Sequence, residues 1–282
     1  MILNLIALLL WVHWRNVPTP AVSTKNNGLS PRLKHHGLRL ARGSVGLLLL
    51  TALLVGRAWF YHQIAPEVDW QPRLTLITYT PQITANLSLP FAWADFSKQL
   101  AFSVVSFAGW LVLYNFVLVF CSVLKPDIDE ARGWRHFLRG QLGIIDRLPT
   151  LIKIPIALTL GVGVHYGAAW WLMQLNIMPP QTPEALMHLA GGMTVLDLRI
   201  VAWCAMSVLG LFVLNSYIYF GGQKFWKTIE TTGQRLLRPF HLFPMRWGRV
   251  DFAPLAGLAL AWGSILLIQP EQLNWLYQRL MG

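Results

Sequence analysis

Six apolar stretches divide the chain, and the segments between them are richer in charged residues and proline. A helix needs about 20 apolar residues to cross a bilayer, with a range of roughly 17–25. The four central stretches meet that length, whereas the first and last are short and suit tilted spans, re-entrant pieces or interfacial helices. The pattern predicts an all-α, multi-pass transmembrane helical bundle with about six membrane-embedded segments, at residues 1–14, 45–64, 100–124, 154–175, 200–220 and 253–268.

The composition agrees with a membrane environment. Of the 282 residues, 55% are hydrophobic and 12% are charged, whereas soluble domains carry roughly 25% charged residues. The formal net charge of +11 would also suit a nucleic-acid-binding protein, so the positions of the charges decide between the two classes.

The basic residues are concentrated in three alternate loops, 15–42, 125–153 and 221–252, which hold eighteen of the 23 lysines and arginines. Such loops stay on the cytoplasmic side of a membrane. We therefore predict a bacterial inner-membrane protein with these loops in the cytoplasm and no nucleic-acid partner. Basic side chains near the bilayer are also attracted to anionic lipid head groups, which contributes about 1 kcal/mol of binding free energy per residue. The predicted lipid and loop anchors are Arg139, Arg238, Arg246, Arg249, Asp251 and Pro254.

A weak internal duplication runs through the chain at an offset of 99 or 100 residues. Each unit consists of a span, a basic loop and a second span that opens at a proline, and both units have the same orientation, as in a parallel repeat. The chain then divides into an N-terminal anchor pair with an outer loop (1–96), a first unit (97–176) and a second unit with an amphipathic tail (199–282). The matched positions are Asn115 with Asn215, Leu138-Arg139 with Leu237-Arg238, Pro155 with Pro254, and Gly163 with Gly263.

The second unit resembles the YggT family of small bacterial and plastid membrane proteins. The stretch "TGQRLLRPFHLFPMRWGRVDFAPLAGLAL" carries the resemblance. In it, Leu237-Arg238-Pro239 stands at the family's Leu-Arg-Pro turn, and Asp251-Phe252-Ala253-Pro254 stands at its Asp-Leu-Ser-Pro helix start. The first unit departs from the pattern, with "LRG" and "IKIP" at these two places. The resemblance implies a role in the envelope, in osmotic stress or in the assembly of membrane complexes, and it supplies no catalytic residues.

Candidate chemistry within the spans is sparse. The sequence has no GxSxG, HExxH or P-loop pattern and no paired carboxylates in the apolar stretches, so we predict that the protein is not an enzyme. Cys121 and Cys204 lie in separate stretches without a CxxC pattern, which argues against a metal site. His165 is the one candidate cofactor ligand, because histidine ligates haem. The other histidines lie at different depths, so we predict no cofactor and favour a neutral, hydrogen-bonding His165.

Polar and small residues in the spans form the remaining candidate sites. Asn115 and Asn215 predict either hydrogen bonds between helices or the lining of a transport path. Small residues four apart let helices approach closely, and they would pack the two units together or bind another protein. The glycines concerned are Gly163, Gly167, Gly257 and Gly263.

Three local features are predicted outside the spans. Asp251 either caps the helix that follows it or pairs with Arg246 or Arg249. Residues 74–80 form a short strand or an extended segment. Residues 225–237 form an amphipathic helix that lies on the membrane surface.

The leading functional prediction is a non-catalytic accessory, scaffold or assembly subunit of a membrane protein complex. Its partners would be the bilayer and other integral membrane proteins, or a second copy of the chain. The alternative is a solute or ion transporter or channel of the cell envelope, because internal repeats suit transporters. Paired charges within the spans mark ion and proton pathways. We expect none in this chain, which favours the accessory subunit.

Overall fold

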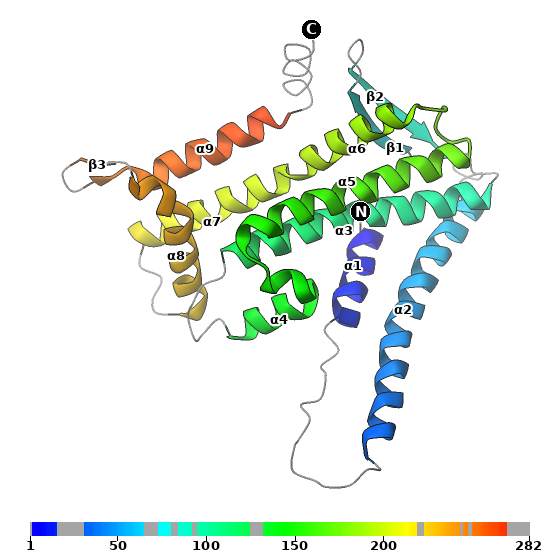
Figure 1. The fold of residues 1–282 in the computed structure, drawn as a ribbon, viewed down its shortest axis with the longest axis horizontal. Helices are drawn as coiled ribbons and strands as arrows, with labels where there is room; N and C mark the ends of the chain where they lie inside the picture. The colour runs from blue at the N-terminus through cyan, green and yellow to red at the C-terminus, as the bar shows by residue number, and fades with distance from the viewer. Residues whose placement is uncertain are drawn as a thin grey trace.

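The computed structural model describes residues 2–15, 31–64, 73–79, 84–91, 95–124, 132–218, 223–242, 245–247 and 250–269. Within these ranges the chain is mainly α-helical, which confirms the predicted class, and it adds two short hairpins (Figure 1). The helices are α1 Ile2–Arg15, α2 Pro31–Ile64, α3 Phe96–Val123, α4 Arg132–Leu142, α5 Thr150–Gln174, α6 Pro183–Asp197, α7 Arg199–Tyr217, α8 Lys224–Leu237 and α9 Ala253–Leu267.

The hairpins join short antiparallel strands. In the first, β1 (Arg73–Tyr79) pairs with β2 (Thr84–Pro90), and Arg73 lies opposite Pro90. Residues 74–79 of the predicted extended segment are therefore a strand, and residue 80 lies outside the described residues. In the second hairpin, β3 (Arg246–Trp247) pairs with β4 (Val250–Asp251).

Four helical segments are long and apolar enough to cross a membrane, and they correspond to the four central predicted spans: Ser44–Ile64, Phe96–Val123, Thr150–Gln174 and Pro183–Tyr217. Six full crossings are not confirmed. At 1.5 Å per residue, α1 with 14 residues and α9 with 15 are roughly 21–23 Å long, which is less than the hydrocarbon core of about 30 Å. Both remain short apolar helices.

The fourth span begins earlier than the sequence pattern predicted. The sequence pattern left residues 183–199 between two predicted spans. In the structure this stretch is helical, and α6 continues through Leu198 into α7. The helix begins where Thr182 Oγ1 accepts a hydrogen bond from Ala185 N at 3.3 Å and Pro183 occupies the first turn, both of which favour a helix N-terminus. His188 and Asp197 therefore lie on a helix and not in a loop.

Pro155 was predicted to open a span, but the structure places it elsewhere in the helix. Helix α5 begins at Thr150, so Pro155 lies inside it. Proline has no N–H, so the helix loses one backbone hydrogen bond there. Pro254, its counterpart, does lie in the first turn of α9.

Helix α3 is central to the arrangement. It contacts α1 and α2 on one side and α5 and α6 on another, while α7 packs against α8 and α9 at the opposite end of the molecule (Figure 1). Gly161 permits the close approach of α5: a Cβ there would lie 2.9 Å from Thr194 Cγ2 of α6 and 3.1 Å from Phe116 Cζ of α3. This packing brings polar positions on three helices to one cavity.

The two proposed repeat units share an order of elements. A short 3-10 helix, η2 (Gly143–Arg147), follows α4, and another, η3 (Arg238–Leu242), follows α8. The series α3, α4, η2, α5 is thus paralleled by α7, α8, η3, α9, except that the β3–β4 hairpin lies between η3 and α9. The duplication itself stays a prediction.

Candidate functional site

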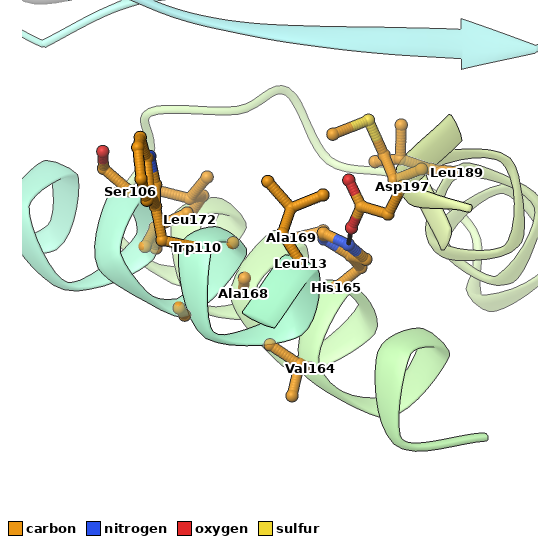
Figure 2. A pocket seen from close by; sticks show the side chains of 14 residues that line it. Ser106, Trp110, Leu113, Val164, His165, Ala168, Ala169, Leu172, Leu189 and Asp197 are labelled. Atoms are coloured by element: carbon orange, nitrogen blue, oxygen red, sulfur yellow. Dashed lines mark hydrogen bonds and ion pairs between the residues drawn. The ribbon is translucent and has the colours of Figure 1, made fainter. Parts of the chain in front are cut away.

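A cavity of about 230 Å³ lies where α3, α5 and α6 meet (Figure 2). Most of its walls are apolar, formed by residues such as Leu172, Leu189 and Met193. Its polar groups come from all three helices: Ser106 and Trp110 from α3, His165 from α5 and Asp197 from α6. Figure 2 shows Ser106 and Trp110 at one side of the cavity and the His165–Asp197 pair at the other.

His165 and Asp197 form an ion pair or hydrogen bond inside the helical bundle. The distance between His165 Nε2 and Asp197 Oδ2 is 2.7 Å, and the two side chains are only 12% and 16% exposed. Both residues lie in predicted membrane-crossing segments. The spans therefore contain a contact between two ionisable side chains that the sequence analysis did not predict, because the span containing Asp197 begins at Pro183 and not near residue 200. A hydrogen-bonding His165 is what the sequence favoured.

A second polar group connects to the cavity through Ser106. The Asn4 side chain of α1 donates a hydrogen bond from Nδ2 to Ser106 Oγ at 2.7 Å and accepts one from Arg57 Nη1 of α2. Arg57 is 6% exposed, and its guanidinium lies over the rings of Tyr61 and Phe102, with 5.4 and 5.1 Å to the ring centroids. Among the described residues, Arg57 Nε has no hydrogen-bond partner.

A third cluster lies at the junction of α3, η2 and α5. Asp146 Oδ1 accepts a hydrogen bond from Ser122 Oγ at 2.7 Å, and Lys153 Nζ donates to the same hydroxyl at 2.7 Å. Lys153 Nζ also lies 4.0 Å from Asp146 Oδ1. Arg139, a predicted anchor, reaches Asp146 Oδ2 at 3.6 Å but is 64% exposed. This cluster ties the basic segment between α3 and α5 to the helices.

The predicted asparagines occupy different surroundings. Asn115 is exposed and donates from Nδ2 to Leu111 O of its own helix at 2.9 Å. It also lines a second cavity, of about 110 Å³, which shares Val164 with the first. Asn215 is half-buried, and its side chain makes no hydrogen bond within the described part of the chain. The structure thus places Asn115 beside a cavity.

The four predicted glycines divide into two kinds. Gly257 is buried, and a Cβ there would lie 3.0 Å from Leu237 Cδ2 and 3.1 Å from Leu209 Cδ1, so α9 packs closely on α7 and α8. At Gly163, Gly167 and Gly263, no described atom lies within 4 Å of an added Cβ. Gly257 therefore serves a contact inside the second unit, whereas Gly163, Gly167 and Gly263 leave open space beside their helices.

The remaining predicted anchors lie around the second hairpin. Arg238 is the first residue of η3, and Arg246 and Asp251 are Cα partners across β3 and β4. Phe252 occupies the N-cap position of α9. Arg249 lies outside the described residues.

Sequence reasoning missed three of the residues that build the site. Asp197 was assigned to a loop, although the apolar run "ALMHLAGGMTVL" just before it indicates a helix. Arg57 stands alone in an apolar stretch, which by itself marks an intramembrane charge. Asn4 lies in the first apolar stretch, and nothing in the sequence apart from its polar side chain indicated a role. Among the residues that the structure describes, no three histidine, cysteine, aspartate or glutamate side chains lie close enough together to hold a metal ion.

The fold and its polar interior are those of a multi-pass helical membrane protein. No protein-family model, curated protein or solved structure matches the chain. The resemblance to the YggT family stays a prediction that rests on the motif around Arg238 and Pro254.

Proposed function

We propose that the protein is a non-catalytic subunit of the bacterial inner membrane that packs against another integral membrane protein, with its basic loops in the cytoplasm. The observation that carries this proposal is the outward face of α5. Leu160, Gly163, Val164 and Gly167 lie on one side of that helix by their spacing, and all four are exposed.

Large apolar side chains such as leucine gain little by leaving lipid for another helix, because the two surroundings are equally apolar. Small residues favour association on such a face because they let two helices pack closely. Helices associate in a bilayer through close packing and polar contacts, not through the hydrophobic effect. Gly163 and Gly167 leave room for a partner backbone, since no described atom lies within 4 Å of an added Cβ. Asn115, exposed on the neighbouring α3, adds an amide beside this face. The resemblance to the YggT family supports the same role.

The test is to fill this face of α5 with larger side chains. Gly163→Ile combined with Gly167→Ile should leave the fold intact, because both positions are open, but should release the partner. The measurement is the native mass of the complex extracted gently from its own membrane. Gly210→Ile is the matched control, because Gly210 lies in α7 and is equally open. Unchanged complexes in the double variant, or a wild-type protein that extracts alone, would contradict the proposal.

A second candidate function, transport of an ion or small solute, is favoured by one observation. The His165–Asp197 pair lines a cavity within the spans, and intramembrane ionisable pairs mark proton and ion pathways. We expect a transporter to dissipate a pH gradient in proteoliposomes, and Asp197→Asn to abolish that dissipation. Asn115→Leu is the companion variant for the second cavity. Proton flux equal to that of empty liposomes would remove proton transport as the candidate.

A further inference from the structure

The lining of the first cavity holds one acidic side chain and no lysine or arginine. Asp197 is the only acidic residue in its lining, and one of its two oxygens, Oδ2, contacts His165. The nearest cation in sequence, Arg199, makes no ion pair with Asp197 within 4.0 Å and does not line the cavity. The Asp197 carboxylate therefore has no lysine or arginine partner within the described part of the chain, and it lies in surroundings of low dielectric, where an uncompensated charge is costly.

We propose that this cavity binds a small organic cation, such as a quaternary or protonated amine, with Asp197 as its counter-ion. The second carboxylate oxygen, Oδ1, has no hydrogen-bond or ion-pair partner within the described part of the chain. Trp110, at the opposite side (Figure 2), offers an aromatic surface, and tryptophan is the best of the aromatic side chains for attracting a cation.

The apolar walls decide which kind of cation fits. An inorganic ion needs several oxygen ligands, and the lining offers only the Asp197 carboxylate and the Ser106 hydroxyl as oxygen-bearing side chains. An organic cation presents hydrocarbon to Leu172 and Leu189 and charge to Asp197. The volume of about 230 Å³ lies below the range of roughly 300–1,000 Å³ that is typical of ligand pockets, which favours a small ligand.

This inference concerns binding and stands whether or not the protein transports its ligand. Binding is measured on the full chain in lipid nanodiscs at pH 8, where an ordinary imidazole is neutral. The probe is benzyltrimethylammonium, and its uncharged carbon isostere, neopentylbenzene, is the matched ligand control. We expect saturable binding of the cation and no competition from the isostere, because the two differ only in charge.

Three variants locate the site. Asp197→Asn should weaken binding at least about tenfold, since it removes the counter-ion in a medium of low dielectric. Gly109→Leu should also abolish binding, because Gly109 lines the cavity and no described atom lies within 4 Å of an added Cβ there. Gly210→Leu, equally open but on α7 and outside the cavity lining, should bind as the wild type does.

The Gly109 variant keeps the test decisive if Asp197→Asn fails to fold, because it fills the cavity without touching the ion pair. The proposal is overturned if the wild type shows no saturable cation binding, or if neopentylbenzene competes equally well. It is also overturned if Gly109→Leu binds the cation as tightly as Gly210→Leu does.

Discussion

Asn4→Leu should destabilise the protein by roughly 3 kcal/mol, because it removes the side chain that hydrogen-bonds the buried Arg57 guanidinium. A buried charged group that loses its partner keeps its full desolvation cost. The same change removes the hydrogen bond from Asn4 to Ser106. The free energy of unfolding is measured in mixed micelles with a denaturing detergent as the titrant.

The double variant Asn4→Leu with Arg57→Met separates this cause from simple loss of packing. Methionine keeps an unbranched side chain over Tyr61 and Phe102 but carries no charge to desolvate. Replacing both partners by apolar groups can be nearly neutral, so we expect the double variant to lie within about 1 kcal/mol of the wild type. A double variant as unstable as the sum of the two single variants would show that the charge is not the cause.

Asp146→Ala should have the second large effect, roughly 3–5 kcal/mol, which is the usual cost of removing one member of a buried ion pair. The Asp146 side chain is 1% exposed, and the Lys153 ammonium 4.0 Å away belongs to a side chain that is 7% exposed. The variant leaves this buried cation without that carboxylate and takes away the acceptor of the Ser122 hydroxyl. The check is the same unfolding titration.

Arg139→Ala is the matched control for Asp146. Arg139 reaches the other oxygen of the same carboxylate, but its side chain is 64% exposed. Exposed pairs contribute about 0–1 kcal/mol, so we expect a loss below about 1 kcal/mol. Equal losses in the two variants would mean that the exposed contact, and not the buried one, holds the carboxylate.

The spans were predictable from the sequence because the length of an apolar run is a local property. The four central stretches became helices of membrane-crossing length, and the short first and last stretches became short helices. The start of the fourth span was missed, since the turn-like "PPQTPE" before it contains both a break and a helix cap. Because the fourth span was predicted to begin at residue 200, Asp197 was not considered as a charged residue within a span.

The sequence by itself determined which segments are apolar and where the basic residues gather. Only the tertiary structure decided which polar residues meet. His165 and Asp197 are 32 positions apart, Asn4 and Arg57 are 53, and Asn4 and Ser106 are 102. The rotation and crossing of packed helices set these meetings. Close approaches such as that at Gly161 fix that geometry, and periodicity along one helix carries no information about the face of another.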